Sequence, residues 1–316
     1  MTNKKIIAVV GATGAQGGGL VRAILEDPAG GFAVRAITRK PESDKARALA
    51  ALGAAVVAAD LDDAASIERA FAGAYGAFLV TNFWEHFSPQ KELDQAHNMA
   101  VAAKAAGLKH VIWSTLEDTR AWVPLSDTRM PTLLDKYKVP HFDAKGEANR
   151  EFVRLGVPTT FLATSFYWDN LIHFGMGPKK GPNGKPAFTL AMGDKPLPGI
   201  AAEDIGPTAY GIFKGGLGYV GKTVGIAGQH LTGKQMAAAL SKALDADVAY
   251  NALEPEQYRG LGFPGADDLG NMFQFNRDFN DEFRRPRDIE RTRSLNPRLQ
   301  TFDQWLAAHK DQIRIQ

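Results

Sequence analysis

A glycine-rich turn directly after the first apolar run restricts the fold of this chain more than any other feature. The run IIAVV, residues 6–10, has the length of one strand, and the following segment spaces Gly11, Gly14 and Gly17 three residues apart. Glycines in such a turn allow a sharp reversal, a bare backbone surface and close packing of the next helix. Free N–H groups at the start of that helix can bind phosphate. The turn therefore predicts a dinucleotide-binding loop.

The first half of the chain alternates short strand-like runs with longer amphipathic segments. The strand-like runs are IIAVV (6–10), AVRAIT (33–38), AAVVAAD (54–60), YGAFLV (75–80), HVIWS (110–114) and TTFLAT (159–164), and a long helix is expected from about Ser88. Such alternation predicts parallel strands joined by helical crossovers, which makes this an α/β fold with a doubly wound sheet.

The alternation becomes irregular near Tyr167, and the Gly/Pro/Lys-rich segment GPKKGPNGKP, residues 177–186, interrupts it. We therefore predict a Rossmann-type domain over residues 1–166. Residues 167–316 are expected to form a smaller α/β lobe that shares part of the sheet and closes over the carboxyl ends of the strands. In this lobe we interpret Asp204 as the N-cap of a helix.

Composition excludes several classes of site. The chain has no cysteine, so disulfides and thiolate chemistry are excluded, and none of its seven histidines forms an H-x-H or H-x-x-x-H pair, so no metal site is proposed. A net charge of +2 without a helix-turn-helix pattern argues against direct nucleic-acid binding. We expect no membrane association and a cytoplasmic location, because no apolar run approaches the roughly 20 residues of a membrane span and no signal peptide is recognised.

The end of the second strand indicates which dinucleotide is preferred. Sites for NAD place a carboxylate there, whereas a 2′-phosphate needs a cation. Here the strand ends in Thr38, Arg39 and Lys40, so we predict NADP(H) bound through the Arg39 guanidinium. Asp60, at the end of the third strand, is placed to meet the adenine with Leu61 beneath the ring. Helix capping is the alternative role for an acid in this segment, and Asp63 could fill it.

The segment KVPHFDAKGEANREF, residues 138–152, reads as the helix that carries the catalytic pair in short-chain dehydrogenases. That pair is Tyr-x-x-x-Lys, because residues i and i+4 share one helix face. Here the pair is His141 and Lys145, and Tyr137 precedes the helix because Pro140 intervenes. Ser114 or Thr115 could supply the accompanying serine role. The tyrosine itself is missing.

Several motifs together resemble the NmrA-like group of atypical short-chain dehydrogenases, especially the HSCARG-type NADP(H) sensors. The motifs are GATGAQGG, TNFWE, HFDAKGE, YWDN, LGFPGADDLGNMF and FDQWL, and they extend over nearly the whole chain. The resemblance implies a Rossmann domain with a small C-terminal lobe, NADP(H) as cofactor, and regulatory work in place of turnover. The family pattern has a tyrosine where this chain has Phe83, which keeps the ring but loses the hydroxyl.

The resemblance, together with the loop and strand ends, implies a set of cofactor contacts. They are Gly11, Ala12, Thr13, Gly14, Ala15, Gln16, Gly17, Arg39, Asp60, Leu61, Thr81, Asn82, Phe83, Lys145, Tyr167, Trp168, Asp169 and Asn170.

Three interpretations of the His141–Lys145 pair stay open. In the first, which we favour, the acid is lost, Lys145 only secures the ribose, and the protein reports the NADPH/NADP⁺ level. In the second, His141 replaces tyrosine as general acid in the reduction of a small ketone, imine, enone or quinone, since its ordinary pKa of about 6.5 suits neutral pH. In the third, the pair resembles the isoflavone-reductase pattern, in which a lysine three residues after a phenylalanine, here Phe142, acts as base.

Aromatic residues at two strand ends predict an apolar pocket. Phe83 and Trp84 follow one strand, and Phe166, Tyr167 and Trp168 follow another. If the two groups face each other across the cofactor, they suit a flat ligand. For partners we expect the dinucleotide, together with a regulatory protein or a small apolar substrate, and a homodimer is compatible with the sequence.

Overall fold

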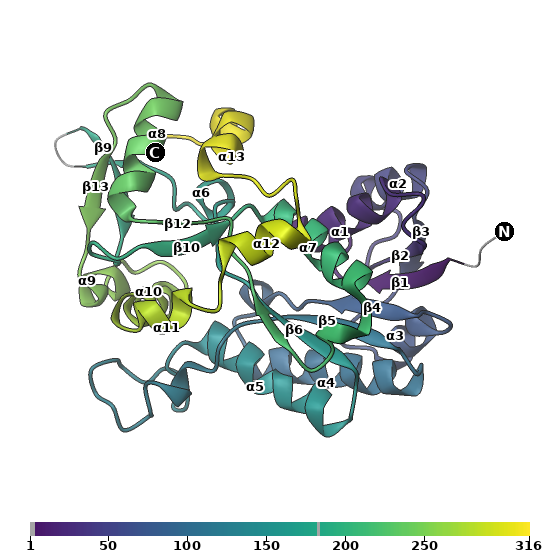
Figure 1. Ribbon diagram of the computed structural model, residues 1–316. Coiled ribbons are helices and arrows are strands. Elements are labelled where there is room, and N and C mark those ends of the chain that lie inside the picture. Colours follow the sequence, from purple (N-terminus) through teal and green to yellow (C-terminus); the bar gives the residue numbers. More distant parts are fainter. Residues whose placement is uncertain (1–3, 182–183) are drawn as a thin grey trace.

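A seven-stranded parallel sheet forms the centre of the main domain in the computed structural model, which describes residues 4–181 and 184–316 (Figure 1). The strand order is β11-β6-β5-β4-β1-β2-β3, with every neighbouring pair parallel. The bounds are β1 Lys5–Val9, β2 Phe32–Thr38, β3 Ala55–Ala58, β4 Gly76–Leu79, β5 His110–Thr115, β6 Thr159–Ala163 and β11 Thr223–Gly225. This confirms the predicted α/β doubly wound sheet.

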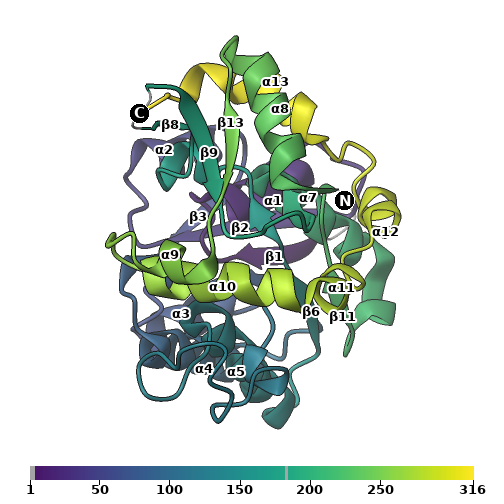
Figure 2. The same cartoon turned by 90° about the vertical axis from the view of Figure 1, so that its left-hand side faces the viewer.

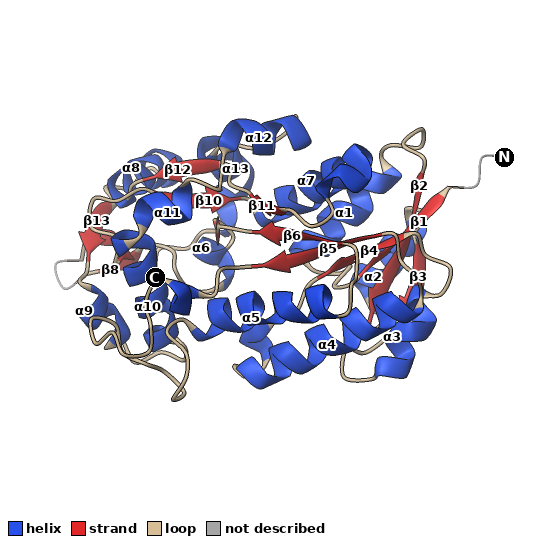
Figure 3. Ribbon diagram, turned by 60° about the horizontal axis from the view of Figure 1, so that its bottom comes forward, coloured by secondary structure: helices blue, strands red, loops and turns tan. Residues whose placement is uncertain are grey.

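Helices cover both faces of this sheet, as Figure 3 shows, with α3, α4 and α5 on one side and α1 and α7 on the other. The helix bounds are α1 Ala15–Leu25, α2 Asp44–Ala51, α3 Ala64–Phe71, α4 Pro89–Ala105, α5 Pro140–Arg154 and α7 Ala202–Gly215. Capping residues in the local sequence determine where several of these helices begin. Ser88 caps α4 and Asp63 caps α3 through side-chain oxygens that accept backbone N–H groups of the first turn.

The strand order reverses between β1 and β4, which are neighbours although they are not consecutive in sequence. Ligands of open α/β sheets bind outside the carboxyl ends of the strands at such a point. The glycine turn follows β1, and Thr81 and Asn82 follow β4. The fold therefore brings two predicted sets of cofactor contacts to one crevice.

Two small sheets build the C-terminal lobe, which Figure 2 faces. They have the orders β12-β10-β7 and β13-β9-β8. The strand bounds are β7 Phe166–Tyr167, β8 Lys179–Lys180, β9 Pro186–Leu190, β10 Leu197–Ile200, β12 Gln229–Leu231 and β13 Ala249–Ala252. The helices are α6 Asn170–His173, α8 Gly233–Leu244, α9 Pro255–Arg259, α10 Ala266–Asp278, α11 Asn280–Arg284, α12 Ile289–Leu295 and α13 Phe302–His309. Short 3-10 turns are η1 Phe83–Glu85, η2 Thr119–Ala121, η3 Gly216–Tyr219 and η4 Lys310–Gln312.

The segment at 177–186 is only partly described, since residues 182–183 lie outside the described ranges, and β8 within it pairs with β9. The domain boundary at residue 167 stays a prediction. Beyond it the chain returns to the main domain, because β11 pairs with β6, α7 packs on α1, and α12 packs on α7. Among the described residues, no helix has the length and apolar character required to cross a membrane.

The N-cap role predicted for Asp204 is wrong. Helix α7 starts at Ala202 with Ala201 as its N-cap residue, and Asp204 lies in the first turn. Its buried carboxylate accepts hydrogen bonds from Asn296 and from the backbone N–H of Gln300. It therefore attaches the C-terminal segment to the main domain, a role that requires residues more than 90 positions away.

Glycines let α1 and α7 approach closely. A side-chain carbon added to Gly206 on α7 would overlap the backbone of Gly19 and Leu20 on α1. Backbone atoms within a helix cannot give way without moving the whole helix. The close contact therefore depends on the absence of a side chain at this position.

We predict that Gly206→Ala destabilises the protein. Alanine raises helix propensity by about 1 kcal/mol, but overpacking costs about 1–3 kcal/mol or more where the opposing atoms cannot yield, so the steric cost wins. Urea unfolding should show a lower midpoint. Gly218→Ala in η3 is the control, because a side-chain carbon there meets nothing within 4 Å. A midpoint for Gly206→Ala equal to that of the control would contradict the proposed contact.

Candidate functional site

The turn between β1 and α1 adopts a backbone that favours glycine. Gly11 has a φ of +65°, and a side-chain carbon at Gly17 would overlap the Gly11 carbonyl. Within the described part of the chain, no side chain caps the N-terminus of α1 and no acid lies in its first turn. The N–H groups of that turn are therefore available to an anion. The turn has the properties that a pyrophosphate requires.

A cavity of about 540 Å³ opens beside this turn. Most of the predicted cofactor contacts line it, namely Gly11, Thr13, Gly14, Ala15, Gln16, Gly17, Arg39, Asp60, Leu61, Thr81 and Asn82. Residues that were not predicted also line it, among them Lys40, Ser43, Lys45, Glu85 and Gln95. Ala12 does not line it. That residue is buried beneath the turn, where its N–H donates to the Ile37 carbonyl.

Both Arg39 and Asp60 lie at the wall of this cavity, but each has a partner within the protein. Arg39 forms a two-point ion pair with Glu85, with N–O distances of 2.6 and 3.0 Å. The Glu85 carboxylate raises the pKa of Arg39. Asp60 accepts the N–H of Asp62 at 3.0 Å, while the separate carboxylate of Asp63 caps α3. Asp63, and not Asp60, is therefore the residue that caps α3, and Asp60 lies beside the cavity.

Lys145 on α5 has all its hydrogen-bonding capacity taken up by the protein. Its ammonium nitrogen donates to the Thr81 carbonyl at 3.1 Å, to the Thr81 hydroxyl at 2.7 Å and to a Glu92 carboxylate oxygen at 2.9 Å. An ammonium has three donors, and these three contacts use them. The Thr81 hydroxyl in turn donates to the same Glu92 oxygen at 2.5 Å. The three residues form a buried cluster that joins β4, α4 and α5.

Glu92 is one of the residues of this site that sequence reasoning missed. Its side chain is 0% exposed, although glutamate is almost never fully buried unless it is paired. The signal available in the sequence was its position on the apolar face of α4, one turn before Ala96 and two turns before Met99, both of which are buried. An acid within such a face indicates a buried partner, but the sequence gives no indication of which residue that partner is.

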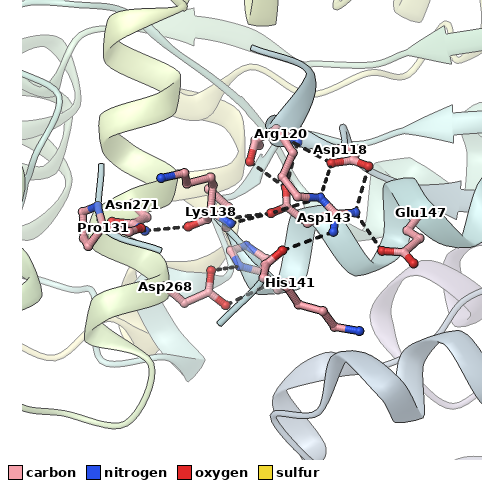
Figure 4. Close-up of polar contacts among 12 residues, drawn as sticks. Asp118, Arg120, Pro131, Lys138, His141, Asp143, Glu147, Asp268 and Asn271 are labelled. Carbon is pink, nitrogen blue, oxygen red and sulfur yellow. Dashed lines mark hydrogen bonds and ion pairs between the residues drawn. The ribbon is translucent and has the colours of Figure 1, made fainter. Parts of the chain in front are cut away.

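His141 is buried and paired, as Figure 4 shows. Its Nδ1 lies 2.6 Å from one oxygen of Asp268 on α10, and its backbone N–H donates to the other oxygen at 3.1 Å. The Trp84 ring lies against the imidazole, with 4.7 Å between centroids. The pairing orients the ring from the C-terminal lobe. Asp268 was not predicted, because 127 residues separate it from His141.

A second carboxylate, Asp143, organises the start of α5 (Figure 4). It accepts the backbone N–H groups of Thr119, Lys138 and Val139 and the Thr119 hydroxyl, at 2.6 to 3.1 Å. Burial raises the pKa of Asp143, and these hydrogen bonds oppose that rise. Tyr137 precedes α5, as predicted, and pairs with Leu133 in a β-bridge. The cluster therefore holds the histidine end of the helix in place.

A second, smaller cavity of about 200 Å³ adjoins the first and shares Gln16, Thr81 and Asn82 with it. It is lined mainly by aromatic and apolar side chains, and also by His141, Lys145 and Asn170. The apolar members include Phe83, Trp84, Phe142, Phe166, Tyr167, Phe174, Met176, Leu269, Met272 and Phe283. The two groups of aromatic residues predicted to face each other therefore do line one pocket, except for Trp168.

Gln16 connects the glycine turn to this second cavity. Its side chain donates to the Tyr167 hydroxyl at 2.8 Å and accepts from the Ser114 hydroxyl at 2.9 Å. Burial raises the pKa of Tyr167 to about 12. This phenol is therefore a poor proton donor at neutral pH. Ser114 lies near the turn, whereas Thr115 bonds to the Lys145 carbonyl and to Asn149.

Three predicted contacts line neither cavity, namely Ala12, which is buried beneath the glycine turn, Trp168 and Asp169. Trp168 packs in the lobe core against Phe302 and Trp305. The Asp169 carboxylate accepts the N–H of Ala202 at the start of α7, and burial raises its pKa. Among residues 4–181 and 184–316, no cluster of three or more His, Asp or Glu side chains could hold a metal ion.

Comparisons with known proteins find similarity to NmrA-like proteins over nearly the whole chain. The family model described as "NmrA-like family" matches residues 3–306. An NmrA-like family domain-containing oxidoreductase, FrzB of Cladobotryum sp, is 30% identical over 295 residues, covering 85% of this chain and 83% of the relative. Two solved structures of NmrA, a negative transcriptional regulator, each cover 96% of this chain and 94% of their own. The complex with NAD has a TM-score of 0.77 at 25% identity, and the complex with NADP has 0.74 at 26%.

We predict strong coupling between Glu92 and Lys145. Glu92→Leu alone should lower the free energy of unfolding by about 3–5 kcal/mol, because it leaves a buried charge unpaired. The double variant Glu92→Leu/Lys145→Met should be more stable than Glu92→Leu alone, since both charges are gone. Urea unfolding of the full double-mutant cycle measures this.

The exposed ion pair of Arg298 and Glu26 provides the control cycle, with side chains 74% and 54% exposed. It should show no measurable coupling. Additive losses at Glu92 and Lys145 would contradict the buried pair.

Proposed function

The chain belongs to the NmrA-like family, and from that premise we propose that it is an NADP(H)-binding sensor or regulator with an incomplete short-chain dehydrogenase site. The observation that carries this proposal is the state of Lys145. All three of its N–H donors are used by Thr81 and Glu92, and the position four residues before it is a histidine. Without a tyrosine, the Lys145 ammonium has no phenol pKa to lower.

The other phenols near the site do not replace the missing tyrosine. Tyr137 lies in the loop before α5, bridged to Leu133, and Tyr167 has a pKa of about 12. The bonds that Lys145 donates also disfavour the role of base, because a nitrogen that donates three hydrogen bonds has no lone pair to accept a proton. In the proposed site, neither a phenol nor Lys145 therefore supplies the acid or base of a short-chain dehydrogenase.

A dinucleotide fits the residues present. The glycine turn and the free first turn of α1 would hold the pyrophosphate, and the cavity of about 540 Å³ would hold the adenosine half. Gln16, Thr81 and Asn82, which both cavities share, would lie beside the nicotinamide half. Solved relatives bind NAD and NADP, which supports the same ligand class here.

The cationic side chains of the cavity wall favour the 2′-phosphorylated dinucleotide, NADP(H), over NAD(H). Arg39, Lys40 and Lys45 all line the adenosine side. A 2′-phosphate adds negative charge that these side chains neutralise, and the planar Arg39 fork matches its oxygens. NADP(H) is therefore the proposed cofactor.

We predict that Arg39→Ala weakens NADP⁺ binding by about 10- to 100-fold, the range expected for loss of a charge-assisted hydrogen bond. NAD⁺ binding should change little. Calorimetric titration of both dinucleotides measures this, with Arg47→Ala as control, because Arg47 is an exposed arginine paired with Asp44 on α2. Wild-type protein that binds NAD⁺ as tightly as NADP⁺ would end the proposed preference.

A second candidate function is NADPH-dependent reduction of a small ketone, imine, enone or quinone. The buried pair of His141 and Asp268 at an apolar cavity favours it. The bound cofactor would supply a hydride. The Asp268 carboxylate would stabilise a protonated His141, whose Nε2 could then pass a proton to the substrate oxygen or nitrogen.

The sensor proposal predicts no NADPH oxidation above background with a panel of quinones, enones, ketones and imines, followed by absorbance. Steady NADPH oxidation that is lost in the His141→Gln variant would contradict the sensor proposal and support the reductase. Asp268→Asn would then lower turnover and shift its pH profile, whereas a purely structural aspartate would leave the profile of the remaining activity unchanged.

A further inference from the structure

We propose that Glu85 limits the preference of this site for NADP(H) by holding the Arg39 guanidinium, so that a 2′-phosphate competes with this carboxylate for the guanidinium. This inference rests on the proposed NADP(H) site. It concerns a residue that sequence reasoning did not select and that is in direct contact with the predicted phosphate ligand Arg39.

The two side chains come from different elements and meet at the same cavity. Arg39 follows β2, and Glu85 ends the short helix η1 that follows β4. Both line the cavity of about 540 Å³. Both terminal nitrogens of the guanidinium are engaged, at 2.6 and 3.0 Å from the two carboxylate oxygens. The guanidinium has five N–H groups in all, but a phosphate bound to the same edge of it needs these two, so on that edge the phosphate competes with Glu85.

The ion pair of Arg39 and Glu85 is weak enough for a ligand to replace it. Arg39 is 55% and Glu85 46% exposed, and ion pairs with this exposure are weak. Each partner nevertheless perturbs the other, because the pKa of Arg39 is raised and that of Glu85 is lowered. Asp60 and Asp62 act on Arg39 only through longer-range attraction. Glu85 is thus the carboxylate that holds the two donors directly.

The same carboxylate would favour the unphosphorylated cofactor. Sites for NAD use an acid to accept the ribose hydroxyls, and Glu85 supplies an acid at this cavity although the end of β2 does not. Removing its charge therefore has opposite expected effects on the two cofactors. NADP⁺ gains a free guanidinium, and NAD⁺ loses an acceptor.

Displacement of Glu85 would also affect residues that line the smaller cavity. Phe83 and Trp84 belong to the same turn, line the smaller cavity, and lie near His141. The ion pair is one of the contacts that hold this turn. A phosphate that takes Arg39 from Glu85 therefore removes a restraint on residues at the proposed reporting end of the site.

Calorimetric titration of NADP⁺ and NAD⁺ into wild type, Glu85→Gln and Asp62→Asn tests the inference. Glu85→Gln should bind NADP⁺ about three- to fivefold more tightly, the range expected for an exposed ion pair, and should bind NAD⁺ no more tightly than wild type does. Asp62→Asn removes a nearby charge that is paired with Lys91 instead. It should leave the ratio of the two affinities unchanged.

The Arg39→Ala background separates competition from other causes. There, Glu85→Gln should no longer change NADP⁺ affinity, because the donors it would release are gone. An equal gain for both dinucleotides, or an unchanged NADP⁺ affinity, would overturn the role of Glu85 while leaving the cofactor proposal intact. Wild-type protein that binds neither dinucleotide would overturn both.

Discussion

The buried contact among Lys145, Glu92 and Thr81 joins three elements at one end of the parallel sheet. Replacing a buried ion pair with apolar residues of similar size is often neutral or stabilising, so stability alone does not account for such a pair. Its effect here is positional. It fixes the register of α5 against α4 and the end of β4, and thereby places His141, one turn earlier on the same helix face, at the smaller cavity.

The C-terminal lobe completes this arrangement from the other side. Asp268 holds the imidazole of His141, and Asn271, also on α10, donates to the Lys138 carbonyl directly before α5. Gln16 makes a comparable connection between the glycine turn and Tyr167. The smaller cavity is therefore built jointly by the glycine turn, the start of α5 and the lobe. A change at any one of them alters the same small volume.

Local signals in the sequence predicted the helices and strands well, but they did not predict which polar side chains pair over long distances in the chain. The strand-like runs, the start of the long helix near Ser88, the cap at Asp63 and the start of α5 after Tyr137 follow from patterns a few residues long. The glycine turn likewise fixes its own geometry. By contrast, Glu92 lies 53 residues from Lys145 and Glu85 lies 46 from Arg39, and no spacing rule connects them. The same limit explains why Asp204 was taken for a cap when its partners lie at the far end of the chain.

These long-range partners change the binding roles that can be inferred for the residues predicted from the sequence. The lysine and the arginine that were predicted to contact the cofactor look like free cations when only the sequence is considered, yet in the folded protein each is already paired with a carboxylate. Their contribution to binding is then a difference between two sets of contacts, the internal one that is broken and the ligand contact that replaces it. At Lys145 the internal set is buried and complete, so exchange is costly. At Arg39 it is exposed and consists of one carboxylate, so exchange is easy. In the proposed site, a ligand therefore replaces an internal contact more readily at Arg39, on the adenosine side, than at Lys145, beside the smaller cavity. This order of costs suits a protein that reads the cofactor better than one that must release it after every turnover.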